Sequence, residues 1–282
     1  MLLIAKQVVN SVRIEYIYIE SISVTYKALF NIIFILTALK GLGQDQLNPD
    51  RPGETKTPEL VKGNNLQLEL GFMKEKIDET QTLYQHPEAI LRYGLFNALE
   101  LRMELVSQTI KDNSGKDNLN GITPVYFGLK AKILPENNWL PSIGAIAQVG
   151  FPSLASGDYF VDGIPFELRT LFNNNINSSF SLQYNLGVAW NETNNHVDNK
   201  QWMYTIAPTY KINDRFHVFI EEYAFLRNGT SAEHYFDGGV QYFLNKDFVF
   251  DLSYGAGVSK ISSDYFIDGG ISYRMNFSRK NK

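Results

Sequence analysis

The sequence contains no cysteine and only four histidines among its 282 residues. The lack of cysteine excludes disulfides, thiolate nucleophiles and zinc–thiolate sites, and so few histidines argue against a histidine-rich metal site. We therefore expect no metal and no cofactor. Basic residues are not in excess either: 26 Lys and Arg stand against 30 Asp and Glu, a formal net charge of −4. This balance argues against nucleic acid as a partner.

Long apolar runs are also missing. No stretch of about 18 or more apolar residues occurs, which argues against a helical membrane protein. Aromatic residues, by contrast, are abundant: 19 Phe, 16 Tyr and 3 Trp make up 13% of the chain. This content excludes a disordered chain, and aromatic side chains favour strands and membrane interfaces.

The N-terminal region has the pattern of an export signal. The apolar run after Lys27 is too short to span a bilayer but suits the hydrophobic part of a secretory signal, and a small-x-small pattern ends at Gly43. We predict that residues 1–43 are a signal peptide. We expect residues 1–26 to be an upstream extension that a mistaken start codon adds. The alternative is a buried N-terminal helix or strand. No cysteine follows the cut, which argues against a lipoprotein anchor.

Residues from Asn64 onward alternate in polarity with a period of two. A period of two places the two sets of side chains on opposite faces of a strand, whereas a helix needs apolar residues three and four apart. The clearest examples are residues 66–72, 99–105, 125–133 and 248–254.

Turn residues divide this region into twelve strands. Each strand has around ten or more residues, longer than the roughly 5–6 of a typical globular strand and close to the 9–11 that a tilted strand needs to cross a bilayer. The predicted strands are 64–75, 86–96, 98–109, 121–134, 139–151, 164–173, 178–190, 201–212, 215–226, 234–244, 247–258 and 263–277.

Short and long connections alternate along the chain. This alternation is typical of an up-and-down barrel with tight periplasmic turns and longer outer loops. We predict an all-β fold, a twelve-stranded antiparallel up-and-down transmembrane β-barrel over residues 64–278. An even strand number places both chain termini on the periplasmic side.

Periodicity alone does not decide which face meets water, because a soluble sandwich gives the same alternation. Three features favour the barrel. The strands are long and follow one another at hairpin spacing. Aromatic residues such as Trp139 and Trp202 cluster at strand ends. The last strand, 268–277, ends in an aromatic residue near the C-terminus and resembles the signal by which outer-membrane barrels reach their assembly machinery.

From these features we expect a monomer in the outer membrane of a Gram-negative bacterium. Its partners would be outer-membrane lipid, lipopolysaccharide and the barrel-assembly machinery, together with an unidentified small solute.

The segment from Asp50 to Pro58, Asp-Arg-Pro-Gly-Glu-Thr-Lys-Thr-Pro, is followed by an alternating Gln-x-Glu-x-Gly strand at residues 67–71. With the closing hairpins of the C-terminal half, it resembles the outer-membrane transporter family of the "MetA-pathway of phenol degradation" type over roughly residues 50–277. Gly53 and Lys56 depart from the acidic residues common in that family. The resemblance implies an outer-membrane barrel that passes small hydrophobic or aromatic molecules.

Residues 44–63 form a polar segment ahead of the first strand. We hypothesise that it folds into the periplasmic mouth and helps to gate a pore, since prolines stiffen it and its charged groups can pair inside a polar lumen. The alternative is a structural lead-in to the first strand. The gate candidates are Asp50, Arg51, Pro52, Glu54 and Pro58.

Alternation also predicts charged side chains that line the lumen. They could guide a solute, or they could form an ion-paired interior that keeps the barrel round, because an unpaired charge in a narrow interior is costly. The candidates are Glu69, Glu100, Arg102, Glu104, Lys130, Lys132, Glu167, Arg169, Asp237, Asp251, Asp268 and Arg274.

An outer-membrane phospholipase also has twelve strands and needs a serine activated by histidine. None of His86, His196, His217 and His234 lies in a matching His-x-Ser-Asn-Gly context. We therefore predict no catalytic residues, and a channel for passive passage of small solutes. The alternative is a non-conducting structural or adhesive surface protein with a plugged barrel.

Overall fold

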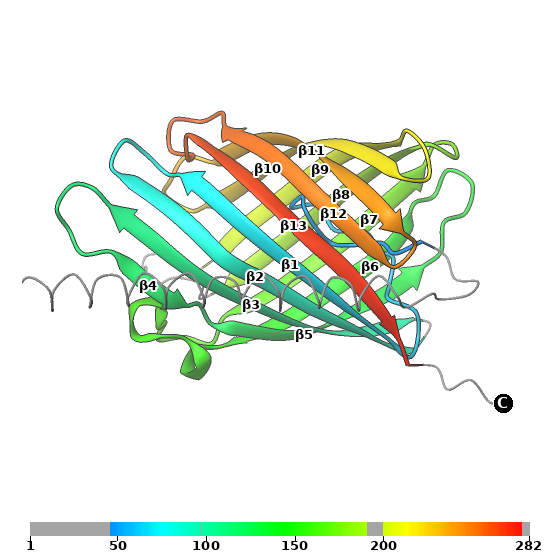
Figure 1. The fold of residues 1–282 in the computed structure, drawn as a ribbon, viewed down its shortest axis with the longest axis horizontal. Helices are drawn as coiled ribbons and strands as arrows, with labels where there is room; N and C mark the ends of the chain where they lie inside the picture. Colours follow the sequence, from blue (N-terminus) through cyan, green and yellow to red (C-terminus); the bar gives the residue numbers. More distant parts are fainter. Residues whose placement is uncertain (1–45, 97, 191–199, 278–282) are drawn as a thin grey trace, which may run out of the picture. The chain divides into compact units, whose positions relative to one another are not determined.

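The computed structural model describes residues 46–96, 98–190 and 200–277. The predicted signal peptide lies outside these residues, as do His196 and Ser278. The prediction of a closed antiparallel barrel of twelve strands is confirmed (Figure 1). Its strands are β1 (Asn65–Lys76), β2 (Gln81–Phe96), β3 (Leu99–Asp112), β5 (Val125–Leu134), β6 (Ser142–Phe151), β7 (Phe166–Asn175), β8 (Phe180–Trp190), β9 (Lys200–Lys211), β10 (Phe216–Arg227), β11 (Glu233–Asn245), β12 (Phe248–Gly257) and β13 (Tyr265–Asn276).

Each strand pairs with the next in sequence, and β1 closes the ring by pairing with both β2 and β13. Asn65 at the start of β1 lies opposite Asn276 at the end of β13, so the described chain begins and ends at the same rim of the barrel. That rim carries the tight turns, such as the one that joins β11 to β12. A thirteenth strand, β4 (Leu119–Ile122), pairs only with β3 and extends the wall beyond the ring.

The predicted strand bounds differ from the structure mainly in two places. β2 begins at Gln81 rather than at residue 86, because Pro87 lies at a β-bulge between Gln85 and Glu88, where a strand tolerates proline. The strand predicted at 121–134 is divided into β4 and β5, because its first residues turn away to pair with the outer end of β3.

The barrel has polar side chains inside and apolar side chains outside. On β1, Gln67 and Glu69 are at most 1% exposed, whereas Phe72 on the outer face is 58% exposed. Leu186 and Leu252 project from the outer face in the same way. A water-soluble protein buries its apolar set, so this distribution is that of a wall in contact with lipid.

Two short 3-10 helices, η1 (Pro152–Leu154) and η2 (Gly157–Tyr159), lie in the loop between β6 and β7. Neither they nor any other helix of the described ranges is long and apolar enough to cross a membrane.

Candidate functional site in the barrel lumen

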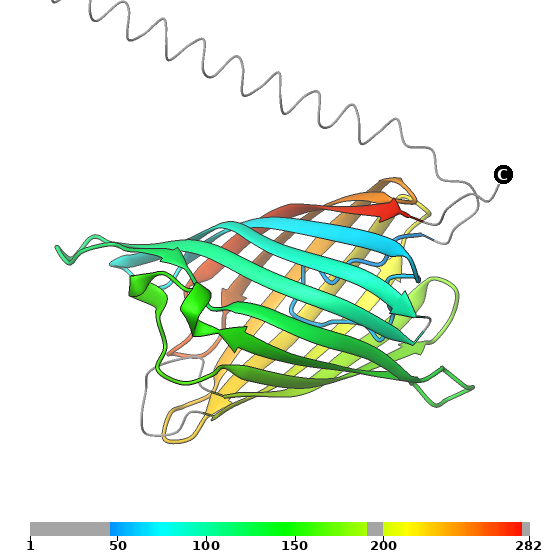
Figure 2. The same cartoon turned by 90° about the horizontal axis from the view of Figure 1, so that it is seen from below.

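The residues ahead of β1 run inside the barrel (Figure 2). We call residues 46–63 the lumen segment. It enters at the rim of tight turns, where the Leu47 amide donates to the carbonyl oxygen of Lys246 at 2.8 Å. The Leu47 side chain is buried against Phe243 and Val249, which point into the lumen from β11 and β12. This apolar contact fixes the point of entry.

Asp50 is the centre of a buried ion cluster. Its carboxylate accepts from Arg102 on β3 and from Lys130 on β5, both at 2.8 Å. Arg92 on β2 lies 3.4 Å away. Burial would raise the pKa of the Asp50 carboxyl, but Arg92, Lys130 and Arg102 outweigh burial and hold that pKa well below its usual range. Asp50 is therefore an anion that three cations of the wall stabilise.

Arg51 points to the neighbouring strands on the other side of β1 and pairs with three carboxylates. Its guanidinium bonds to Asp268 on β13 at 2.7 Å, to Asp251 on β12 at 3.3 Å, and to Glu88 on β2. Its side chain is almost completely buried. Adjacent residues of the segment thus carry opposite charges, and both find their counter-charges on the strands around β1.

Glu221 on β10 holds the tip of the lumen segment. Its carboxylate accepts from the backbone amides of Glu54 and Thr55 and bonds to the Thr55 hydroxyl. The Thr55 hydroxyl also lies 2.6 Å from that of Thr205 on β9. Glu54 itself pairs with Arg169 on β7 at 2.8 Å. The tip is therefore tied to three further strands.

The segment then returns along β2, β3 and β5 to the start of β1. The Lys56 ammonium donates to the carbonyl oxygens of Asp50 and Gly53, which links the returning part of the segment to its first part. Glu59 pairs with Lys132 at 2.7 Å, and the Val61 amide donates to Glu100 at 2.8 Å. These contacts hold the segment as a compact hairpin-like loop across the lumen.

The predicted gate residues all belong to this loop. Asp50, Arg51 and Glu54 form the ion pairs described above. Pro58 is buried against Gly144 on β6, and Pro52 lines a cavity beside the segment.

The predicted lumen charges divide into three groups. Most of them bond to the segment or support a residue that does: Glu69, Glu100, Arg102, Lys130, Lys132, Glu167, Arg169, Asp251 and Asp268. Arg274 instead pairs with Asp247 at the rim, at 2.7 Å. Glu104 and Asp237 face the lumen without contacting the segment through a salt bridge, and Asp237 lies opposite Glu221 in the β10–β11 pair.

Sequence reasoning missed Arg92 as a site residue. It is completely buried, it binds both oxygens of Glu100 at 2.7 and 2.9 Å, and it contacts Glu69 at 2.8 Å. Two neutral residues were also missed, Thr205 and Asn185. The Asn185 amide exchanges hydrogen bonds of 2.8 Å with the backbone of Lys56. One signal was available for Arg92: it lies four residues after Glu88 on the same strand, so a period of two places both side chains on the same face.

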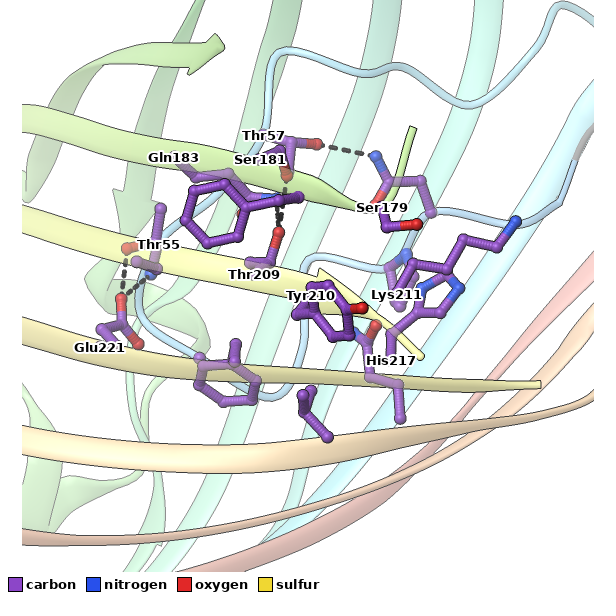
Figure 3. A pocket seen from close by; sticks show the side chains of 18 of the residues that line it. Thr55, Thr57, Ser179, Ser181, Gln183, Thr209, Tyr210, Lys211, His217 and Glu221 are labelled. Atoms are coloured by element: carbon purple, nitrogen blue, oxygen red, sulfur yellow. Dashed lines mark hydrogen bonds between the residues drawn. The ribbon is translucent and has the colours of Figure 1, made fainter. Parts of the chain in front are cut away.

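A cavity of about 200 Å³ lies between the lumen segment and the wall formed by β8, β9 and β10 (Figure 3). Ser181, Gln183 and Thr209 line it from the wall, and Thr55 and Thr57 line it from the segment. The segment therefore narrows the lumen without filling it.

The described histidines lie in different places: His217 lines this cavity from β10, whereas His234 lies elsewhere on the wall. His234 bonds through Nδ1 to Glu222 at 3.1 Å, and Tyr204 donates to the same carboxylate at 3.0 Å. Glu221 and Tyr235, the chain neighbours of Glu222 and His234, point into the lumen. Because successive side chains of a strand alternate between its faces, Glu222, His234 and Tyr204 lie on the outer face of the wall.

Known structures share this architecture. The COG4313 outer membrane channel from Pseudomonas putida F1 superposes with a TM-score of 0.61 at 10% identity, over 80% of this chain and 99% of that one. The NanC porin gives 0.51 at 14% identity, over 74% and 100%. The KdgM porin, in complex with disordered oligogalacturonate, gives 0.50 at 10% identity, over 73% and 98%. At these identities the likeness shows the fold alone.

No curated protein matches the sequence. A family model does match, over residues 49–275, which includes the lumen segment from Pro49 onward as well as the barrel. The chain belongs to the family described as "Putative MetA-pathway of phenol degradation".

Proposed function

We propose that the protein is a channel in the outer membrane of a Gram-negative bacterium and that the lumen segment is its gate. Small solutes would diffuse passively through the channel. The observation that carries the proposal is the cavity of about 200 Å³ that remains between the segment and the wall. Twelve strands enclose a lumen between the filled interior of about 8 strands and the open pore of 16–18, so one inserted loop is enough to set its width.

The comparisons support this proposal. The COG4313 relative is named as an outer membrane channel, and the NanC and KdgM relatives are named as porins. The family description refers to phenol degradation, which fits small hydrophobic or aromatic solutes. In this proposal the lumen charges act mainly by holding the gate, and neither catalysis nor a cofactor is required.

A second candidate is a structural or adhesive surface protein in which the segment is a permanent plug. The density of buried ion pairs at Asp50 and Arg51 favours it, because breaking such a pair costs about 3–5 kcal/mol. In either case the outer surface would contact outer-membrane lipid and lipopolysaccharide, and β13 would carry the signal for barrel assembly.

A disulfide lock separates the two candidates. The sequence has no cysteine, so Thr55→Cys with Thr205→Cys introduces a single pair where two hydroxyl oxygens now lie 2.6 Å apart. Single-channel conductance is measured in planar bilayers before and after reduction. We expect the wild type to conduct, the oxidised variant to conduct less, and dithiothreitol to restore the wild-type level. Each single-cysteine variant is the control.

Other outcomes contradict the proposal. Equal conductance of the oxidised and reduced pair means that the segment is not the gate. A folded wild-type barrel that stays silent at every voltage, while a variant lacking residues 46–63 conducts, identifies a permanent plug.

A further inference from the structure

The lumen segment contacts the two sides of the barrel differently. Its ionised groups Asp50, Arg51 and Glu59 pair with β2, β3, β5, β12 and β13, and Glu54 pairs with Arg169 on β7. On the other side, β8 contains no charged residue at all, and β9 has only Lys200 and Lys211, at its two ends. Most ion pairs of the segment therefore lie on the charged wall, and the cavity of about 200 Å³ lies along the uncharged one.

The uncharged wall presents hydroxyl and amide groups to that space. The Ser181 and Thr209 hydroxyls lie 2.6 Å apart, and the Gln183 amide lies 3.5 Å from Thr209 (Figure 3). A hydroxyl group both donates and accepts, so these side chains can exchange their mutual bonds for bonds to a hydroxyl-bearing solute. At about 200 Å³ the cavity is smaller than the roughly 300–1,000 Å³ of typical ligand pockets, which limits the solute to about one ring.

The cations that border the cavity are already paired with carboxylates, and its carboxylates Asp50 and Glu221 already accept bonds. Glu221 accepts from the amides of Glu54 and Thr55. Lys211 pairs with Asp214 at 2.7 Å, and Arg51 pairs with Asp268. An organic anion would therefore lose its hydration without gaining an unpaired cation, which is costly in a confined space. An uncharged solute avoids that penalty.

Beyond Glu221 and Asp237, which lie opposite each other, β10 and β11 carry aromatic side chains. Tyr223, two residues further along β10, stacks on Tyr235 of β11 with ring centroids 5.1 Å apart, and Phe266 of β13 completes the cluster. A solute leaving the cavity past Glu221 would meet aromatic surface. This surface suits a molecule with an apolar face as well as hydroxyl groups.

We propose that solutes travel along β8, β9 and β10, through the cavity beside the segment, and that this path selects small uncharged hydroxyl-bearing molecules over organic anions. The proposal rests on the channel function proposed above. It predicts a selectivity different from that suggested by the oligogalacturonate, an acidic sugar, named with the KdgM porin.

Galactose and galacturonate test the proposal, because they share one ring and differ in one carboxylate. Proteoliposomes are loaded with equal concentrations of galactose and potassium galacturonate, and valinomycin lets potassium compensate the anion's charge. We expect galactose to leave at least about tenfold faster, since a penalty of about 1.4 kcal/mol already gives that factor.

Two variants of the uncharged wall, with one control, test whether the selectivity arises there. Ser181→Lys puts a cation in the cavity and is expected to speed galacturonate efflux several-fold. Asn120→Lys, on exposed β4, adds the same charge elsewhere and is expected to change nothing. Thr209→Val removes a hydroxyl without adding charge and is expected to slow galactose several-fold. It keeps the test valid if the lysine variant does not fold.

The outcomes distinguish this inference from the channel function itself. Equal efflux of the two sugars through a wild-type channel that conducts overturns the selectivity and leaves the channel standing. No efflux of either sugar together with no conductance overturns the channel function.

Discussion

Gly71 and Gly270 lie directly opposite each other on β1 and β13 and together leave the space that the Arg51 guanidinium occupies. A Cβ atom added at Gly71 would lie 2.0 Å from Nη1 of Arg51, and one at Gly270 would lie 2.7 Å from Nε. Both glycines are therefore part of the site that holds the lumen segment, although neither carries a side chain.

Alanine at position 71 is expected to expel Arg51 from between the strands. Because a methyl group and the guanidinium cannot share this space, Gly71→Ala should break the pairs of Arg51 with Asp251 and Asp268 and raise single-channel conductance. Combining Gly71→Ala with Arg51→Ala should add little to Arg51→Ala alone, since both changes remove the same contact. The measurement is conductance in planar bilayers.

Gly269→Ala is the matched control for this prediction. A Cβ atom at position 269 would meet its nearest neighbour at 3.5 Å, an ordinary contact, so conductance should stay at the wild-type level. Heat-modifiable gel migration checks that every variant is a folded barrel. Additive effects of Gly71→Ala and Arg51→Ala would show that the glycine does not act through Arg51.

The wall of the barrel was predictable from the sequence, whereas the arrangement inside it was only partly so. Period two gave the two faces of each strand because alternation is a local property. The partner of each lumen charge depends on strand register and on the path of residues 46–63, which no local pattern encodes. Arg92 was missed because Ile90, also turned inward, breaks the polar alternation of β2. Thr205 and Asn185 carry no charge, so nothing in the sequence distinguished them.

Acidic pH should break the contacts of Asp50 with the wall only below the ordinary carboxyl range. The pKa of Asp50 is lowered in the folded state by Arg92, Lys130 and Arg102 against the effect of burial. Its stabilising contribution is therefore fully present above the unfolded pKa of about 3.9 and is lost as the pH falls through the lower folded value. We expect a step in conductance that depends on Asp50 and lies below about pH 4.

Asp50→Asn tests the assignment of this pH step. It should raise conductance already at pH 7, because Arg102 and Lys130 lose their ion pair with the segment, and it should abolish the step. Asp78→Asn is the control: hydrogen bonds from Thr80 and Gln81 lower the pKa of this exposed loop carboxyl as well, but Asp78 does not contact the segment. If the step in conductance at acidic pH persists in Asp50→Asn, another group is responsible for it.

An outward-facing leucine can test whether the wall meets lipid. Leu252 lies at the middle of β12 and is 52% exposed. Leu252→Arg should lower the free energy of unfolding by about 2–4 kcal/mol in a bilayer, because a cation at mid-depth is costly. Denaturant unfolding of the barrel in liposomes gives this value. Leu119→Arg on β4, outside the ring, should change it little. Equal, small effects of both would indicate a wall in contact with water.

Glu221 and Glu222 are neighbours on β10 with opposite orientations, which makes them a matched pair for testing the hold on the segment tip. Glu221→Gln keeps one acceptor oxygen and turns an amide donor towards the donors of Glu54 and Thr55, so at least one bond to the tip is lost. Hydrogen bonds to charged groups contribute about 1.5–3 kcal/mol, which corresponds to about a 10–100-fold increase in the open-to-closed ratio of single channels.

The same substitution should not weaken the wall. It removes the repulsion between Glu221 and Asp237, which face each other across β10 and β11, so the free energy of unfolding should stay level or rise. Glu222→Gln affects only the contacts with Tyr204 and His234 on the outer face and should leave gating unchanged. If both variants shift the open-to-closed ratio equally, the effect arises from a general loosening of β10 and not from the contact with Thr55.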